Sequence, residues 1–496
     1  MAELGVLLSF PPDDHSKLSP KKYDDLLQNY FKRLEKIPHT AWTRSLDKKN
    51  LLDMLNPEVN SIPYLFALNA HIKAAGINET KKLEALINYA LIFAATFDPI
   101  QIRYVGEEWR TQIEWLLDTL PRFGSMDLSP ITSAMLRLDP TSGTFTSIHL
   151  RLVRACLALG TPSTALPILD RNIYALPTTP PKNVPDDLLS EDHELSNSFI
   201  TPKSGFTLKL QPEYILEYYL LGAHVYIGTH NFPRARLFLE YVLLTPSIQH
   251  TVSAMQVEAY KRWVLVGLLA EGKPYPHPRT NDAGAMRAIR AVAKPYDALA
   301  ESFEKREWTK YMAEMDVGAA VWHEDGNLRL VREAGDALLR YRVIDLQKTY
   351  AALPLSCVAT HIGFTPEQTL GLVTEMIRAR HLMASLTPAA SGEAQDAVLR
   401  FHTTSLREDH DLEAQTKRIE DLISFVRDAD RRLQLTKEYS ECVRRTKRSG
   451  PDADLADQMD LSWDNGGGGS MMGGGDFGAP IMVQDDDEGD EDLMGG

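Results

Sequence analysis

Cysteine is scarce in this sequence, which limits both its redox chemistry and the ways in which its fold can be stabilised. Three cysteines occur in 496 residues, and Cys156, Cys357 and Cys442 lie far apart. So odd and sparse a set argues against a disulfide framework and is typical of a reducing compartment. Apolar residues make up 44% of the sequence, so a sizeable hydrophobic core can form without disulfides.

Sequence motifs for catalysis are missing as well. No two of the 14 histidines are separated by a single residue, and neither His-Glu-x-x-His nor Cys-x-x-Cys occurs. Metal-activated water needs clustered imidazoles and a carboxylate, and His193, although followed by Glu194, has no second histidine beside it. The glycines at 466–469 lack the lysine of a phosphate-binding loop. We therefore expect no catalytic, metal-binding or cofactor-binding residue, and a protein that is not an enzyme.

Long hydrophobic runs are also absent. The longest, residues 85–97, contains Asn88 and is too short to cross a bilayer. Near the N-terminus, Glu3 stands where a secretory signal carries positive charge, and Pro11 and Pro12 interrupt the apolar stretch. We therefore expect a soluble protein that makes no contact with a membrane.

Basic residues are absent from one part of the chain only. Residues 450–496 contain 13 Asp or Glu and no Lys or Arg, which leaves −2 of the net charge of −15 for the rest. The length of the chain allows about three domains. The part of the chain before residue 450 is nearly neutral, so it has no electrostatic field that would attract nucleic acid. Runs of glycine and of Asp and Glu predict a disordered tail over 449–496.

Amphipathic helices dominate what is present. Residues 82–97 and 107–120 have helical periodicity, and so do two pairs of segments that resemble tetratricopeptide hairpins. The first pair is 147–158 with a segment through Leu169, and the second is 214–227 with a segment through Leu239. One hairpin cannot bury its own apolar face, so we expect stacked helical repeats over 1–282.

Small residues and polar composition refine this reading. In the second hairpin, Ala223 and Ala235 would let two helices approach closely while Tyr226 and Phe232 fill the gap. Residues 177–211 are rich in Pro, Ser, Asp and Thr, and we interpret them as a surface insertion.

Residues 283–337 continue the helical series, with helices predicted over 285–303 and 309–321, and the pattern changes at 338–405. A helix through Leu339 and Tyr350, a short helix at 356–361 and a third helix opening with a capping box at Thr365 precede two short alternating segments. Three helices followed by a β-hairpin predict a winged helix.

A single long helix is predicted over 406–448. Its apolar residues recur at three–four spacing and form a narrow seam that needs a partner. The basic run at 444–448 is either a nuclear-import signal or a favourable cationic helix end. The seam consists of Leu412, Ile419, Leu422, Val426, Ala429 and Leu433.

Two side chains in the winged helix have a chemical alternative. We interpret His361 as a packed or capping residue rather than a ligand, and Cys357 as small core filler rather than a nucleophile, since no third group is identifiable. The third helix sets Glu367 and Glu375 against its arginines and so lacks the basic excess of a DNA-reading helix.

Helical repeats, a winged helix and a terminal helix together are the layout of PCI-domain proteins. These are scaffold subunits of the COP-nine signalosome, the proteasome lid and a translation initiation factor complex. Over roughly residues 60 to 445 the chain resembles the subunit-three family of the signalosome. The stretches that carry the resemblance are 221–226, 231–235, 258–263, 325–331, 373–378 and 399–402.

This resemblance implies a non-catalytic scaffold in the cytoplasm and nucleus. The complex removes a ubiquitin-like modifier from cullin ligases (deneddylation), winged-helix hairpins of neighbouring subunits join edge to edge, and C-terminal helices form one bundle. The edge would lie at 382–386 or 398–401. The implied partner-interface residues are Leu382, Ala384, Leu386, Leu399, Phe401, Leu412, Ile419, Leu422, Val426 and Leu433.

Two alternatives remain open from the sequence. The chain could instead be a PCI scaffold of the proteasome lid or of an initiation factor complex. It could also be a winged-helix nucleic-acid binder that uses Arg378, Arg380 and the basic run at 444–448. Such binding would weaken steeply with salt.

Overall fold

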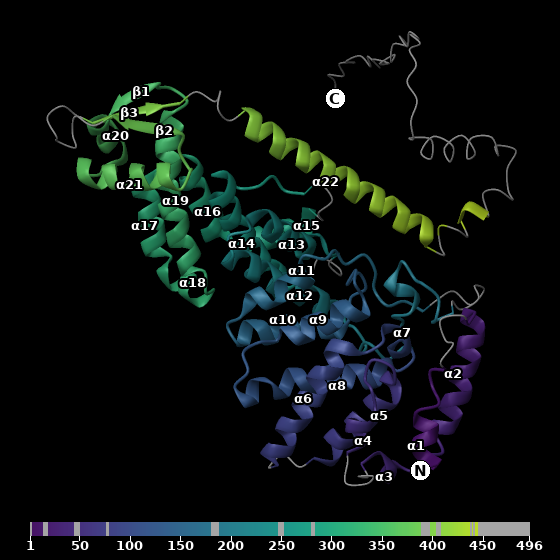
Figure 1. The fold of residues 1–496 in the computed structure, drawn as a ribbon. Coiled ribbons are helices and arrows are strands. Elements are labelled where there is room, and N and C mark those ends of the chain that lie inside the picture. Colours follow the sequence, from purple (N-terminus) through teal and green to yellow (C-terminus); the bar gives the residue numbers. More distant parts are fainter. Residues whose placement is uncertain are drawn as a thin grey trace, which may run out of the picture. The chain divides into compact units, whose positions relative to one another are not determined.

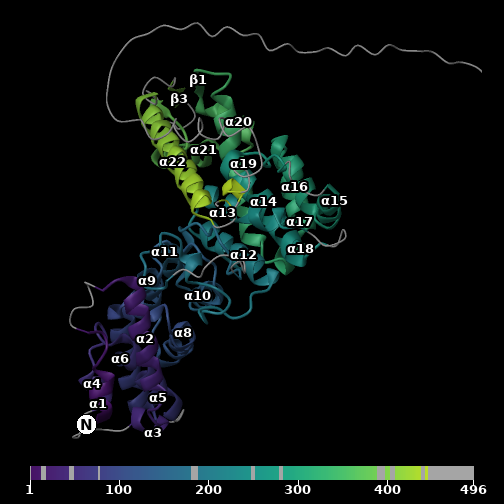
Figure 2. The same cartoon turned by 90° about the vertical axis from the view of Figure 1, so that its right-hand side faces the viewer.

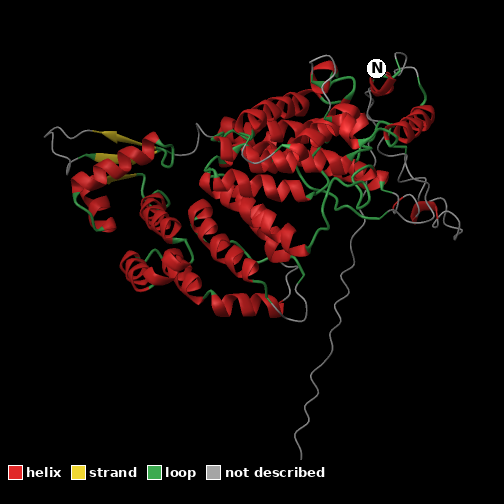
Figure 3. Cartoon of the chain, turned by 90° about the horizontal axis from the view of Figure 1, so that it is seen from below, coloured by secondary structure: helices red, strands yellow, loops and turns green. Residues whose placement is uncertain are grey.

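Helices account for most of the chain, as predicted, and one small sheet accompanies them (Figures 1 and 3). The structure is a computed structural model. It divides into two compact units, Met1–Ser424 and Phe425–Gly496. The described residues are 2–12, 18–43, 50–75, 79–179, 188–246, 252–278, 283–387, 397–402, 408–436, 439 and 442–444.

The first half of the chain is a series of helices (Figures 1 and 2). Their buried side chains share one hydrophobic core. The predicted all-helical architecture of this part of the chain is thus confirmed. The series consists of α1 (Ala2–Leu7), α2 (Pro20–Leu34), α3 (His39–Trp42), α4 (Leu51–Met54), α5 (Ser61–Ala74), α6 (Thr80–Thr96), α7 (Pro99–Ile102), α8 (Gly106–Thr119), α9 (Ser129–Leu138), α10 (Ser147–Ala158), α11 (Leu166–Leu169), α12 (Pro212–Gly228), α13 (Phe232–Leu244) and α14 (Ala254–Glu271).

One of the two predicted hairpins forms as expected. In α12 and α13, Ala223 and Ala235 are fully buried. The ring that packs on Tyr226, at 5.1 Å, is that of Phe238 and not of Phe232 as predicted; Phe232 is half-buried and packs on His230. The other hairpin differs, because a 3₁₀ turn (Pro162–Ala165) and the four-residue α11 follow α10 in place of a long helix. Pro162 and Pro167 each lack a backbone N–H and can only begin a helix, so a long second helix cannot run through them.

The predicted surface insertion at 177–211 is wrong for residues 188–211. Phe199, Ile200 and Phe206 are at most 3% exposed, and the Phe206 ring packs edge to face on Trp109 at 5.8 Å. The prediction rested on the mostly polar composition of the segment and did not weigh these three apolar side chains. Residues 180–187 lie outside the described part of the chain.

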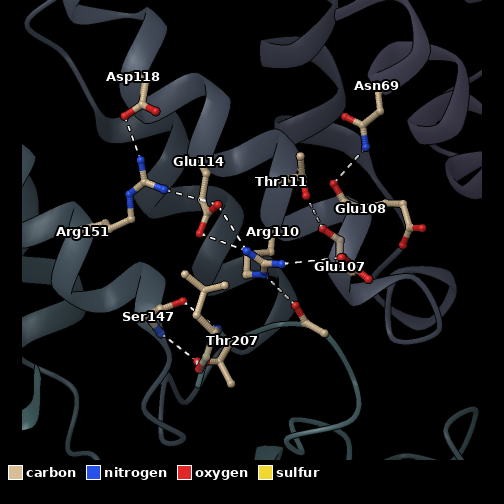
Figure 4. A network of polar contacts seen from close by, with 12 residues as sticks. Asn69, Glu107, Glu108, Arg110, Thr111, Glu114, Asp118, Ser147, Arg151 and Thr207 are labelled. Carbon is tan, nitrogen blue, oxygen red and sulfur yellow. Dashed lines mark hydrogen bonds and ion pairs between the residues drawn. The ribbon is translucent and has the colours of Figure 1, made fainter. Parts of the chain in front are cut away.

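Polar contacts also hold this segment against the repeats (Figure 4). Arg110 of α8 and Arg151 of α10 each lie 3.3 Å from Glu114, which joins the two helices. The backbone N–H of Ser147, at the start of α10, donates to the hydroxyl of Thr207 at 3.0 Å. The segment is therefore part of the repeat core and not an appendage to it.

The next helices are shorter than the predicted segments. Gly318 interrupts the predicted helix 309–321, and a Cβ there would lie 2.6 Å from the ring of Trp322. The absence of a side chain at Gly318 lets Trp322 become 1% exposed. The helices are α15 (Ala283–Val292), α16 (Lys294–Glu304), α17 (Trp308–Val317), α18 (Ala319–Glu324) and α19 (Leu328–Leu346).

Two of the stretches that carry the family resemblance meet in this region. Lys261 of α14 lies 2.6 Å from the carboxylate of Asp325, which also accepts a hydrogen bond from the Tyr296 hydroxyl at 2.8 Å. The side-chain amide of buried Asn327 donates to the same hydroxyl at 2.8 Å. These residues therefore connect α14, α16 and the turn before α19, which is a structural role.

A second hydrophobic core follows, built on α19 and the elements after it. The strands form an antiparallel sheet in the order β1-β3-β2, and the predicted capping box is present between Thr365 and Gln368. The element order is the one predicted for a winged helix, with β1 in addition. The elements are β1 (Ala352–Pro354), α20 (Leu355–Ile362), α21 (Pro366–Arg378), β2 (Ala384–Thr387) and β3 (Val398–Phe401).

One helix, α19, contributes to both cores. Val331 and Leu338 belong to the larger core, whereas Leu339 and Val343 belong to the second. The domain boundary predicted from the sequence, between residues 337 and 338, therefore falls inside a continuous helix.

The chain continues into α22 (Glu408–Leu435), which is shorter than the predicted 406–448. Residues 445–496, including the tail predicted to be disordered, lie outside the described residues. No helix in the described ranges is long and apolar enough to span a membrane.

Candidate functional site

The sheet presents one well-formed free edge, on β2. The N–H of His402 donates to the carbonyl of Met383 at 2.9 Å. Because antiparallel partners alternate along a strand, Ser385 bonds to β3, while the N–H and C=O groups of Ala384 and Leu386 point away from it. No described strand pairs with that side. Such an edge can accept an added strand.

The other two strands offer less free edge to an added strand. β3 is the central strand, and Phe401 donates its N–H to the carbonyl of Ala351 at 2.9 Å, so the free edge expected at 398–401 is closed. The edge of β1 ends in Pro354, which has no N–H, and α20 begins at the next residue.

The side chains predicted for this interface face inward. Leu382, Ala384, Leu399 and Phe401 are at most 8% exposed and belong to the core of the winged helix, and Leu386 is half-buried beside them. A partner at β2 would therefore meet backbone groups and not an apolar patch. Sequence alternation identified which residues share a face, but it could not say which face is covered.

The second candidate surface is the apolar stripe of α22. The predicted residues Leu412, Ile419, Leu422, Val426 and Leu433 all lie on this helix and are 53–60% exposed. The structure adds Ile423 and Phe425, at 45% and 49% exposure, which the three–four spacing omitted.

The stripe occupies a single side of the helix. At about 100° per residue, the seven side chains fall within an arc of roughly 160°, whereas Leu435 projects from the opposite side. So many exposed apolar side chains on one side of a helix are typical of an interaction site.

The chemically reactive side chains considered above do not form a site. Cys357 is exposed and not in the core, which corrects the prediction, and His361 is exposed one turn later on α20. Partial burial of the ring, together with the nearby Arg342, lowers the pKa of His361. On α21, Arg378 lies 3.9 Å from Glu375. Among the described residues, no group of three possible ligands could hold a metal ion.

Comparison with known proteins identifies the family. Residues 21–283 match the family model for the N-terminal helical repeats of COP9 signalosome complex subunit 3, and the match ends where α15 begins. A relative from Emericella nidulans, named COP9 signalosome complex subunit 3, is 31% identical over 82% of this chain and 85% of its own length. The chain belongs to this family.

Two further relatives carry the same name, COP9 signalosome complex subunit 3. The one from Neurospora crassa is 27% identical over 71% of this chain and 71% of its own length. The one from Dictyostelium discoideum is 22% identical over 90% of this chain and 98% of its own length. Subunit-three proteins thus align with both the repeats and most of the chain that follows them.

Proposed function

We propose that this member of the subunit-three family is a non-catalytic scaffold of the signalosome. The observation that carries the proposal is the exposed apolar stripe of α22 in a chain whose relatives are named as subunits of that complex. The other signalosome subunits are its partners. Through them it supports deneddylation of cullin ligases, and the zinc-dependent step belongs to another subunit.

The edge of β2 and the stripe of α22 contribute to assembly in different ways. A neighbouring winged helix adds a strand to β2, whose outward N–H and C=O groups at Ala384 and Leu386 supply hydrogen bonds. Helices of other subunits cover the stripe of α22. Full burial of a large apolar side chain contributes about 1.5–3 kcal/mol, so this stripe is the larger source of affinity. The strand edge fixes the orientation of the neighbours.

The location of the protein follows from this role. We place it in the cytoplasm and nucleus, where cullin ligases act. Whether the basic run at 444–448 assists import is tested by replacing its Arg and Lys residues with Gln and measuring the nuclear fraction of a fluorescent fusion.

Native mass spectrometry of the tagged protein, purified from its own cells, tests the scaffold role. We expect a particle that contains the other signalosome subunits, including a zinc isopeptidase, in equal amounts. A monomer or homodimer would contradict the proposal. Co-purification with proteasome-lid or initiation-factor subunits would instead assign the chain to a sister complex.

A further inference from the structure

A cavity in the helices after the repeats lies apart from both candidate surfaces. It opens between α15, the start of α16 and the segment that follows α14, and these three helices pack on one another. Its volume is about 670 Å³. Pockets for small ligands typically measure about 300–1,000 Å³. The cavity is therefore large enough to be a binding site in its own right.

The spacing of residues along α15 brings cationic and apolar side chains to this cavity. Met286, Arg287, Arg290 and Ala291 fall within an arc of roughly 140° at about 100° per residue, so they share one face of the helix. Met286 is 9% exposed and belongs to the larger core, whereas both arginines are exposed. Lys294, the first residue of α16, adds a third cation. The cavity thus combines an apolar floor with a positive margin.

The positive charge of the cavity is only partly neutralised. Asp297 of α16 also lines it, and both of its carboxylate oxygens are engaged: one accepts from Nε of Arg290 at 3.0 Å and the other from the hydroxyl of Tyr260 at 2.7 Å. Arg287 and Lys294 have no acidic partner in the part of the chain that the structure describes. The three cations and one carboxylate leave the described lining with a net charge of +2 when His277 is neutral.

The ring of His277 forms a flat wall of the cavity. It is inclined by only 19° to the ring of Trp263 and by 20° to that of Tyr260, with centroids 5.4 Å and 6.1 Å away. These two rings of α14 pack on the imidazole, and its exposed part lines the cavity. Burial, followed by the charge of Arg290, lowers the pKa of His277, so the ring is neutral at pH 7. An aromatic ring held in this way can stack on a planar group.

We propose that this cavity binds a small organic phosphate monoester. Its phosphate pairs with Arg287 and Lys294, its apolar part contacts Met286 and Ala291, and a planar group stacks on His277. A phosphate monoester carries a charge of about −1.5 to −2 at pH 7, which complements the unneutralised charge of the lining. The proposal does not rest on the scaffold role, because it uses neither α22 nor the edge of β2.

A side-chain carboxylate from a neighbouring subunit fits the cavity less well. Its single charge would leave one of the two unpaired cations, Arg287 or Lys294, without a partner. A stable protein interface also buries about 1,200–2,000 Å² in total, far more than one cavity of this size supplies. The observations therefore favour a small ligand.

Isothermal titration calorimetry of the full-length chain tests the proposal, with adenosine 5′-monophosphate (AMP) as the probe. The wild type should bind AMP more tightly than adenosine, which has no phosphate, and more tightly than ribose 5-phosphate, which has no planar group. Arg287→Gln with Lys294→Gln should weaken AMP binding about tenfold, because one ion pair at an exposed position contributes up to about fivefold. Its melting temperature should be unchanged, since both side chains are exposed.

Two further variants sharpen the test. Arg329→Gln with Arg332→Gln on α19 removes the same charge at exposed positions that do not line the cavity, so it should bind AMP as the wild type does. His277→Ala should reduce the affinity for AMP to that for ribose 5-phosphate and leave the affinity for ribose 5-phosphate unchanged.

Four outcomes would overturn the proposal. Absence of AMP binding at millimolar concentrations would show that the cavity holds no such ligand, and equal affinity for adenosine and AMP would show that it does not recognise phosphate. Equal weakening in the α19 control would assign the binding to the overall charge of the chain. Loss of co-purifying subunits in the cavity double variant would assign the cavity to a partner. Failure of the scaffold role in native mass spectrometry would leave the expected AMP affinities unchanged.

Discussion

At the scale of single residues, the stability of the fold depends on the protonation state of a buried histidine. His149, in the first turn of α10, is 4% exposed. Its Nδ1 accepts from the backbone N–H of Thr146 at 3.1 Å, and its Nε2 lies 2.8 Å from the hydroxyl of Ser142. The neutral ring satisfies both contacts, whereas a second ring proton would oppose the N–H of Thr146.

This arrangement predicts a stability that depends on pH. Burial lowers the pKa of His149 to about 4, whereas an unfolded histidine titrates near 6.5. The unfolded chain therefore binds more protons between these values, and stability present above pH 6.5 is lost as the pH falls towards 4. As the pH falls from 6.5 to 4, the proton that His149 binds only in the unfolded chain lowers the free energy of unfolding by on the order of 3 kcal/mol.

Urea unfolding at several pH values measures this contribution. The variant His149→Gln should be less stable at pH 7, and its stability should fall less steeply between pH 6.5 and 4 than that of the wild type. An unchanged slope would show that His149 does not carry the effect.

At the scale of elements, the two candidate surfaces differ in kind. The stripe of α22 is a side-chain surface whose residues do not support the described cores, because none of them is buried. The edge of β2 is a backbone surface whose side chains do support a core. Substitutions therefore have to be chosen differently for each.

For α22 we predict that Leu422→Asp with Val426→Asp releases the protein from its complex and leaves the fold intact. These side chains are 55% and 60% exposed, so charge is tolerated in the free chain but not in a helix bundle. If each is worth about 2 kcal/mol of binding, affinity falls roughly a thousandfold.

Affinity purification and circular dichroism check this prediction. Leu435→Asp is the matched control, since Leu435 is 46% exposed and projects away from the stripe; it should assemble normally. Loss of helicity or of the thermal transition in the double variant would mean that the stripe is intramolecular.

For β2 we predict that Ala384→Pro weakens assembly at small cost to the fold. The N–H of Ala384 points away from β3, so proline removes a donor that only an added strand would use. Ser385→Pro removes an N–H directed at β3 and should destabilise the winged helix by about 1–3 kcal/mol. Melting curves and co-purification of both variants make the comparison; equal stability losses would contradict the assigned strand register.

At the scale of the whole molecule, α19 makes the winged helix depend on the repeats. Leu338 and Leu339 are adjacent, yet they belong to different cores. A change on one side of the helix should therefore be felt on the other, within the unit Met1–Ser424.

We predict that Leu338→Ala weakens the winged helix from outside it. Loss of this fully buried side chain costs about 2–5 kcal/mol, and the free energy of opening at the Phe401 amide should fall with it. Ile113→Ala in α8, equally buried, should leave that amide unaffected. Native-state hydrogen exchange measures both, and an equal response to both variants would mean that the unit unfolds as a whole.

The sequence by itself determined features that depend on neighbours along the chain. The capping box at Thr365, the burial of Ala223 and Ala235, and the stripe from Leu412 to Leu433 are all patterns of a single helix or hairpin. Helical periodicity is local, so these predictions needed no knowledge of the rest of the fold.

Only the tertiary structure decided the features that depend on distant contacts. β1 has three residues, too few for a recognisable alternation, and it exists because β3 pairs with it from more than 40 residues away. Phe199 and Phe206 are buried because Trp109 and the helices around it supply a surface for them. A hydrophobic pattern states which residues avoid water, but the partner that covers them is set by the rest of the chain.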